Sequence, residues 1–241
     1  MRKTVVFVEG NTELIFVREY LLKHFEYNNI EIECRKMQAK KPYDVPFSIS
    51  NPNAKVHFRI IDTGGDGNVL DYIIEDEIKL RNIGYEKIIG LRDMYSDEYK
   101  KKVKQPMRID NDEIQKFIAR ANKRIESNTK FPSSIKFNFA IMELEAWLLA
   151  IPNIWTKKGV SNQSIKEKLG FNLSEIDPET TFLHPAETIK NILKTINESY
   201  RKQANEVESL VGKITKQDFE DLQNSQKCNS FKEFASNLTL I

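Results

Sequence analysis

Apolar residues along the chain gather into short runs separated by amphipathic stretches. Runs rich in β-branched and aromatic residues predict four buried strands, over residues 4–8, 56–61, 87–91 and 135–141. Between them, apolar residues recur at helical spacing and predict helices over residues 13–25, 69–82 and 110–127. Strands that alternate with helices need crossover connections. We therefore expect an α/β fold with a mainly parallel four-stranded sheet flanked by helices.

The pattern changes near residue 151. Beyond it, short helical segments and prolines follow one another, and no run predicts a strand. Pro178 and Pro185 stand where proline is favoured, at the first position of a helix. We expect an α/β domain over residues 1–151 and an α-helical C-terminal region over residues 152–241 packed on it.

Two stretches inside the α/β region have weaker patterns. Residues 30–35 form a short extended piece that would add a strand to the four. Residues 40–53 contain three prolines and predict a loop. Residues 62–68, with the sequence DTGGDGN, predict a strand-to-helix turn, because they lack the lysine of a phosphate-binding loop and the closing ligand of a calcium loop.

The composition indicates a globular protein of a reducing compartment. Of the 241 residues 40% are apolar, and no apolar stretch is long enough to cross a membrane. The amino terminus shows no signal-peptide pattern, and the only cysteines are Cys34 and Cys228. We expect a cytoplasmic protein with free thiols. With a net charge of +2, nucleic-acid binding would depend on local basic patches.

Acidic residues follow three of the four predicted strands. They are Glu9 and Glu13 after the first strand, Asp93 and Asp97 after the third, and Glu143 and Glu145 after the fourth. Because the carboxyl ends of parallel strands lie at one edge of a sheet, we expect these side chains to converge. Converging carboxylates need a cation to neutralise them. Oxygen ligands without nearby histidine or cysteine favour Mg²⁺, Mn²⁺ or Ca²⁺ over zinc.

Each acid also has a structural interpretation. Glu13 fits a first-turn residue that the helix dipole favours, and Asp97 fits a solvated loop. Glu143 and Glu145 point the same way only if the strand continues through them; on a helix, one would be a ligand and the other a salt-bridge partner. Asp93 is harder to explain structurally, since it interrupts an apolar run at the end of a strand.

Three motifs together resemble a TOPRIM domain. They are the sequence VEGNTE at residues 8–13, an aspartate after the third strand, and MELEAWLLA at residues 142–150. The likeness is to the OLD-like and DUF4276-type TOPRIM proteins of bacteria, which include anti-phage defence effectors. Pro185 and the segments 200–202 and 228–234 are similar to the tail of the DUF4276 group.

The resemblance implies Mg²⁺-dependent phosphodiester chemistry. It makes Glu9 and the aspartates after the third strand metal ligands, with Glu9 also a possible general acid or base. Glu13 is a ligand in the OLD-like branch. The sequence departs from the family pattern Asp-x-Asp, because the acid after Asp93 is Asp97. Three alternatives follow: Asp97 folds back to serve a second metal, Glu143 or Glu145 completes that second site, or the second site is degraded. The number of metal ions, one or two, is therefore left open by the sequence.

Basic residues add two candidates. The run from Lys100 to Lys104, with Arg108 beyond, fits either a phosphate-binding segment or a solvated loop. Lys202 stands at a predicted helix end, where a cation favours the dipole. The resemblance suggests instead that Lys202 approaches the site and stabilises charge in the transition state.

Two functions follow. The first is a Mg²⁺- or Mn²⁺-dependent nuclease, with Glu9, Asp93 and Lys202 as its catalytic residues, acting on DNA or RNA by endonuclease or exonuclease cleavage. The second is a catalytically silent or partner-activated TOPRIM subunit. Such a subunit would work with an ABC- or SMC-type ATPase, because this chain carries no ATPase motif of its own. We expect no membrane partner, and the sequence leaves the oligomeric state open.

Overall fold

The computed structural model describes residues 1–65, 67–103 and 108–239, which form two compact units. The first unit comprises Met1–Arg92, Asn111–Phe139 and the end of the chain from Ser236. The second comprises Asp93–Asp110 and Ala140–Ala235. The predicted boundary at residues 151–152 lies inside the second unit, because helix α5 (Glu145–Leu149) packs against later helices of that unit.

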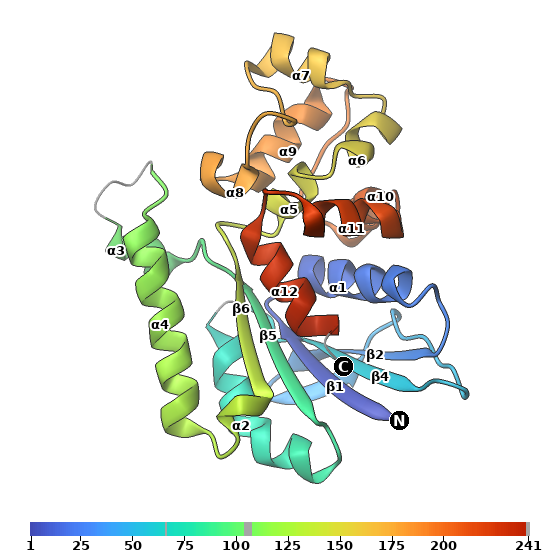
Figure 1. Ribbon diagram of the computed structural model, residues 1–241, viewed down its shortest axis with the longest axis vertical. Helices are drawn as coiled ribbons and strands as arrows, with labels where there is room; N and C mark the ends of the chain where they lie inside the picture. The colour runs from blue at the N-terminus through green and yellow to red at the C-terminus, as the bar shows by residue number, and fades with distance from the viewer. Residues whose placement is uncertain (66, 104–107, 240–241) are drawn as a thin grey trace. The chain divides into compact units, whose positions relative to one another are not determined.

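A six-stranded sheet forms the centre of the first unit (Figure 1). Its strands are β1 (Arg2–Val8), β2 (Ile30–Gln38), β3 (Lys41–Asp44), β4 (Val56–Asp62), β5 (Lys87–Asp93) and β6 (Ile135–Ala140). Across the sheet their order is β3-β2-β4-β1-β5-β6. The four strands β2, β4, β1 and β5 pair in parallel, and β3 pairs antiparallel with β2.

The expectation of four strands was wrong by two, β2 and β3. The extended stretch at residues 30–35 is part of β2, and the predicted loop at residues 40–53 contains β3. Buried and half-exposed positions alternate along most of β2, so its sequence lacks the continuous apolar run of β1. β3 is fully exposed and contains Pro42, which an edge strand tolerates. Apolar runs therefore missed the mostly polar strands.

Three helices of the first unit cover the two faces of the sheet. They are α1 (Asn11–His24), α2 (Asn68–Asn82) and α4 (Asn111–Asn128). The crossover through α1 leads from β1 toward β2, whereas those through α2 and α4 lead toward β5 and β6. Right-handed crossovers in opposite directions put α1 on one face and the other two helices on the opposite face (Figure 1).

The neighbouring strands β1 and β5 mark a switch in this topology. The chain leaves β1 toward one edge of the sheet, and after β5 it next enters the sheet at the other edge. In open α/β sheets, such a switch point is where ligands bind, beyond the carboxyl ends of the strands. β1 and β5 are aligned with Val8 opposite Leu91, and Glu9 comes directly after this aligned pair.

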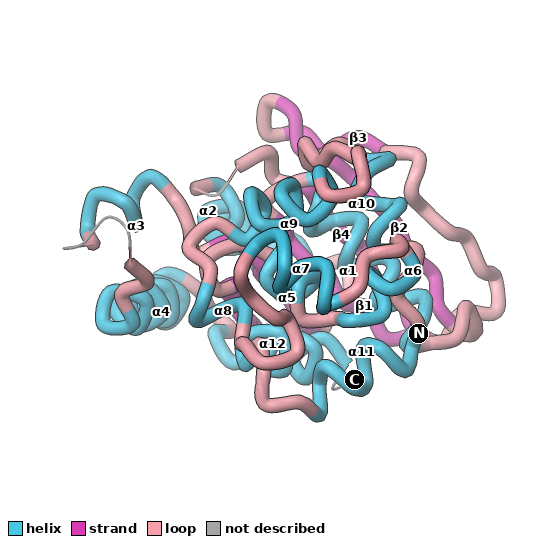
Figure 2. The backbone as a smooth tube through the Cα atoms, turned by 90° about the horizontal axis from the view of Figure 1, so that it is seen from above, coloured by secondary structure: helices cyan, strands magenta, loops and turns pink. Residues whose placement is uncertain are grey.

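In the second unit the regular elements of the described residues are helices (Figure 2). They are α3 (Asp97–Lys102), α5, α6 (Pro152–Lys157), α7 (Asn162–Leu169), α8 (Pro178–Thr181), α9 (Pro185–Lys194), α10 (Ala204–Val211), α11 (Lys216–Asn224) and most of α12 (Asn229–Thr239). α8 and α9 begin at the two prolines, as predicted. Trp147 packs against Phe231 and Phe234 in the core. None of the described helices is long and apolar enough to span a membrane.

Candidate functional site

The first acidic group lies in the first unit, at the carboxyl ends of β1 and β4. Glu9 follows β1 directly, and α1 begins two residues later with Glu13 in its first turn. The Glu13 side chain is only 4% exposed. A Cβ added at Gly10 would lie 3.3 Å from Glu13 Oε2, so the carboxylate folds back over this glycine. The absence of a side chain at residue 10 gives the Glu13 carboxylate its place.

Asp62 is the third member of the first acidic group, and sequence reasoning missed it. It ends β4 opposite Val8 and is 2% exposed. The backbone N–H of Gly64 donates to Asp62 Oδ1 at 2.8 Å, and Lys36 Nζ lies 3.5 Å from Oδ2. Residues 62–68 had been interpreted only as a strand-to-helix turn. The available signal was that Asp62 ends a predicted strand, just as Glu9 follows one.

The loop after β4 is tied to the end of β1 by backbone hydrogen bonds. Thr63 donates its N–H to the carbonyl of Val8 at 2.9 Å, and Gly65 donates to the carbonyl of Glu9 at 2.9 Å. These bonds hold Asp62 beside the strand that carries Glu9. The neighbouring Asp66 of the predicted turn lies outside the described residues.

The second acidic group lies in the second unit and consists of Asp93, Glu143 and Glu145. Asp93 is the last residue of β5 and is 6% exposed. Its Oδ1 accepts the backbone N–H of Leu144 at 2.8 Å. Asp93 therefore braces the turn between β6 and α5, in which Met142 has a left-handed backbone with φ of 61°. Strained backbone of this kind persists only where the surroundings enforce it.

Glu143 and Glu145 are brought together by Lys202. Its Nζ lies 3.6 Å from Glu143 Oε1 and 3.1 Å from Glu145 Oε2, the latter contact being an ion pair without hydrogen-bond alignment. Glu145 is fully buried, and the hydroxyl of Tyr200 donates to its Oε1 at 2.9 Å. Neither strand nor helix carries both acids, since Glu143 lies in the turn and Glu145 begins α5. Lys202 itself has a left-handed backbone, with φ of 57°.

Electrostatics at Glu143 are set by burial and by Lys202. Burial raises the pKa of this carboxyl, the Lys202 ammonium lowers it, and the neighbouring charge of Glu145 raises it again, with a net upward shift. The backbone N–H of Ala186, in the first turn of α9, donates to Glu143 Oε2 at 2.8 Å. The second acidic group is therefore a partly neutralised cluster in which one ammonium serves two carboxylates.

A family model, described as a domain of unknown function and named DUF4276, matches residues 8–239. The chain belongs to this family. No protein with a curated description and no solved structure matches it. The predicted resemblance to the DUF4276 group is thus confirmed, over a span that contains every candidate site residue from Glu9 to Lys202.

Asp97 and the basic run that follows it form a short helix in this family member. Ser96 caps α3, and its hydroxyl accepts the N–H of Tyr99 at 3.2 Å. Asp97 is largely exposed and pairs with Lys100, with 2.6 Å between Oδ1 and Nζ, and this hydrogen bond lowers its pKa. The basic run is therefore helical through Lys102 rather than a loop, whereas Lys104 lies outside the described residues.

A third cluster, of Asp177, Glu179 and Cys228, was not predicted as a site. One oxygen or sulfur of each lies within 4.8 Å of the others. The indole N–H of Trp147 donates to Glu179 Oε1 at 2.8 Å, and the N–H of Cys228 donates to Asp177 Oδ1 at 3.2 Å. Burial raises the pKa of Glu179 to about 7 and that of the Cys228 thiol well above its usual value. Protonated groups are poor metal ligands, so this cluster fits an internal hydrogen-bond network.

Proposed function

We propose that this DUF4276 protein is a metal-dependent hydrolase of phosphodiester bonds in nucleic acid, a nuclease of the TOPRIM type. The observation that carries the proposal is the Glu13 carboxylate, buried and folded back over Gly10 at the carboxyl end of β1. Beside it, Asp62 is a second buried acid at the end of the paired strand β4. Carboxylate oxygens at neighbouring strand ends are the hard donors that a divalent cation such as Mg²⁺ or Mn²⁺ prefers. The ammonium of Lys36, 3.5 Å from Asp62 Oδ2, also lies at this end of the sheet.

The proposed metal ligands of the first unit are Glu9 and Glu13, and Asp93 of the second unit is a candidate ligand by the family resemblance alone. These oxygen donors fit Mg²⁺ or Mn²⁺. A bound ion would polarise the scissile phosphate and lower the pKa of its water. Glu9 is more exposed than Glu13, which suits a group that also takes a proton from the attacking water. Asp97 is left out of this set because Lys100 already neutralises it on an exposed helix.

Lys202 is the proposed cation for the transition state. In the second unit it is held between Glu143 and Glu145, at 3.6 and 3.1 Å, and its side chain is 36% exposed. A held but accessible ammonium can approach a phosphate without a large loss of conformational entropy. Glu143 and Glu145 act in this proposal as positioning residues for Lys202.

The test is nucleic-acid cleavage. Plasmid, single-stranded DNA and tRNA are incubated with the protein and Mn²⁺, Mg²⁺ or chelator. We expect metal-dependent cleavage that falls roughly 100-fold or more in Glu9→Gln and in Glu13→Gln, because each change removes a ligand charge. Glu126→Gln, which removes an exposed charge of α4, is the matched control and should cleave as the wild type does. Cleavage that survives chelator, or that survives in both ligand variants, would overturn the proposal.

One observation favours a second candidate, a TOPRIM subunit that is silent alone and is activated by an ABC- or SMC-type ATPase. Lys202 already offsets part of the charge of Glu143 and Glu145 within the isolated chain, which favours a resting state without metal there. Under this proposal the isolated chain binds Mn²⁺ without cleaving, and cleavage begins only when the ATPase is added. In either form the proposed role is an effector of anti-phage defence.

A further inference from the structure

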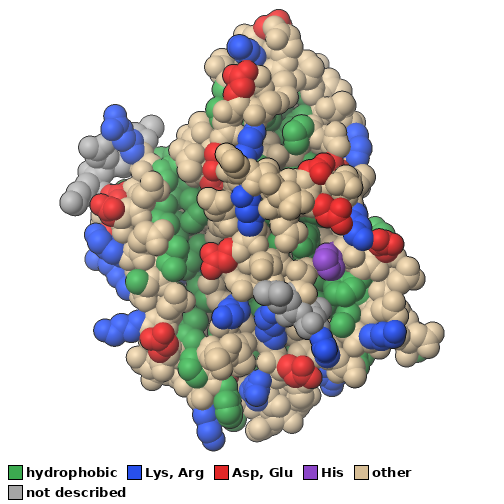
Figure 3. Space-filling model, in the orientation of Figure 1, with side chains coloured by type: hydrophobic (Ala, Val, Ile, Leu, Met, Phe, Trp, Pro, Cys, Tyr) green, Lys and Arg blue, Asp and Glu red, His purple; other side chains and the backbone are tan. Residues whose placement is uncertain are grey.

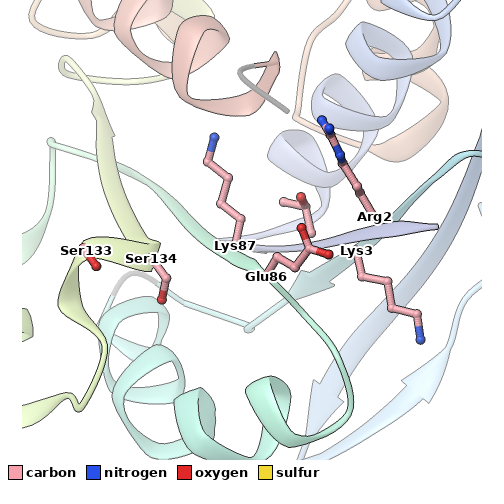
Figure 4. A pocket seen from close by; sticks show the side chains of 7 residues that line it. Arg2, Lys3, Glu86, Lys87, Ser133 and Ser134 are labelled. Carbon is pink, nitrogen blue, oxygen red and sulfur yellow. The ribbon is translucent and has the colours of Figure 1, made fainter.

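A pocket of about 500 Å³ lies at the amino-terminal edge of the sheet, in the first unit. It is bordered by the starts of β1 and β5 and by the 3-10 helix η1 (Pro132–Ser134), which precedes β6 (Figure 4). Three basic side chains, three hydroxyl side chains and one acid line it. The sequence pattern had placed residues 2 and 3 only at the start of a strand.

Strand geometry gathers the basic residues. Successive side chains of a strand point to opposite faces, so Arg2 and Thr4 share one face of β1. Thr4 is paired with Lys87 of β5, which places Lys87 on that same face. Figure 4 shows the Arg2 and Lys87 side chains extending to one side of β1, and Lys3 to the other. Arg2 and Lys87 thus flank the buried Thr4.

The pocket is locally positive although the molecule is nearly balanced. Over the face seen in Figure 3, basic and acidic side chains are interspersed. The pocket lining, by contrast, contains three basic residues, Arg2, Lys3 and Lys87, and one acid, Glu86. Burial lowers the pKa of Lys87, and the neighbouring charge of Lys136 lowers it further. An anion in the pocket would offset both effects.

We propose that this pocket binds the phosphate group of a nucleotide or of a nucleic-acid strand. The guanidinium of Arg2 and the ammonium of Lys87 are the donors that phosphate oxygens favour. The hydroxyl of Ser133 adds a donor, whereas that of Ser134 donates to the Phe131 carbonyl at 2.8 Å. A volume of about 500 Å³ leaves room for a sugar and base beside the phosphate.

The pocket is separate from the proposed metal site and does not depend on it. Glu9 comes seven positions after Arg2, which at about 3.3 Å per residue amounts to roughly 20 Å along the strand. Binding at the pocket should therefore persist without divalent metal. Measurements in chelator separate a failure of this proposal from a failure of the nuclease proposal.

Two ligands distinguish the sources of phosphate. A fluorescently labelled single-stranded DNA of about 12 nucleotides is followed by anisotropy, and ATP is titrated by calorimetry, both in EDTA. We expect at least one of them to bind, and the double variant Arg2→Gln/Lys87→Gln to weaken that binding roughly tenfold or more. The control Lys41→Gln/Lys123→Gln, with the same change in charge on exposed positions of β3 and α4, should bind as the wild type does.

The salt dependence of the affinity shows whether the pocket binds a nucleic-acid strand. If the DNA binds, the slope of log affinity against log salt should decrease by about 1.4 in the pocket variant, at about 0.7 per lost phosphate contact on a single strand. Two DNA sequences of equal length should bind equally, because phosphate contacts carry no sequence information. Binding of ATP alone would assign the pocket to a free nucleotide.

A variant that removes negative charge from the pocket is expected to strengthen binding, a result that misfolding would not give. Glu86 is the one acid of the pocket and is exposed, so Glu86→Gln should leave the fold intact and strengthen binding severalfold. The proposal is overturned if neither ligand binds, if the pocket variant and the control lose affinity equally, or if Glu86→Gln leaves the affinity unchanged.

Discussion

The two units of the protein accommodate buried carboxylates in different ways. In the first unit, Glu13 and Asp62 stand at strand ends and owe their positions to strand register and to a helix start. Glu77 of α2 is satisfied by backbone, since the N–H groups of residues 130 and 131 donate to it at 3.0 and 2.7 Å. These acids are positioned mainly by the backbone.

In the second unit the buried acids Glu145 and Glu179 depend on side chains from distant parts of the chain. Tyr200 and Lys202 meet Glu145 across about 55 residues of sequence. Trp147 and Ser230 both contact Glu179. The comparison teaches that acids at strand ends are placed by local structure, whereas those among the helices are placed by tertiary contacts. An acid placed by the backbone is available as a metal ligand, whereas an acid placed by tertiary contacts is already paired with other side chains.

The largest predicted effect tests the electrostatic side of this comparison. Burial raises the pKa of Glu179 to about 7 from an ordinary 4.5. The folded state therefore holds this proton more tightly than the unfolded state. The stabilisation is fully present below pH 4.5 and is lost as the pH rises through 7. Between these values the free energy of unfolding should fall by ~3 kcal/mol in the wild type relative to Glu179→Gln.

Urea unfolding of both proteins across this pH range measures the difference. The Gln variant keeps an oxygen that accepts from Trp147, so it serves as its own structural control. Parallel pH profiles for the two proteins would show that Glu179 ionises in the folded state as it does in water. In that case the second unit would not hold its acids in the way described.

A middle-sized effect is expected from crowding in the first unit. A Cβ added to Gly90 of β5 would lie 2.5 Å from Phe137 Cδ2 and 2.8 Å from Ile73 Cδ1. We expect Gly90→Ala to lower the free energy of unfolding by about 2 kcal/mol, because the packed side chains must move. Gly67→Ala is the control, since its Cβ would meet nothing within 4 Å. It should lower the free energy of unfolding by less than about 0.5 kcal/mol. If the two variants lower the free energy of unfolding equally, Phe137 and Ile73 are not packed closely against Gly90.

The smallest predicted effect compares two buried tryptophans of the second unit. Trp147 Nε1 donates to Glu179, whereas Trp155 Nε1 is buried without a hydrogen-bond partner among the described residues. Phenylalanine removes the indole N–H from each. Trp147→Phe should therefore lower the free energy of unfolding, measured in urea, by about 1 kcal/mol more than Trp155→Phe does. If Trp155→Phe costs as much or more, the contact with Glu179 contributes no net stability.

Much of the fold could be predicted because its signals are local. The apolar runs identified β1, β4, β5 and β6, and the helical spacing identified α1, α2 and α4. β2 was predicted only in part because buried and half-exposed residues alternate along it. β3 was missed because it contains Pro42 and is followed by two further prolines. Such strands are specified by their pairing rather than by their own composition.

The candidate site could be predicted only where strand ends define it. Glu9, Glu13 and Asp93 follow from the ends of apolar runs. The partners of Glu145 could not be predicted, because Lys202 and Tyr200 reach it through a chain path of helices whose packing the sequence pattern leaves open. The basic pocket was likewise hidden, since Arg2 and Lys87 meet only through the parallel pairing of β1 and β5.

Calorimetric titration with Mn²⁺ tests most directly the claim that the acids at the end of β1 hold a divalent ion. The proteins are wild type, Glu13→Gln and the exposed control Glu126→Gln. The account predicts saturable binding to the wild type and the control, weakened roughly tenfold or more in Glu13→Gln. Wild-type protein that takes up no Mn²⁺, or Glu13→Gln that binds it equally well, would contradict the account.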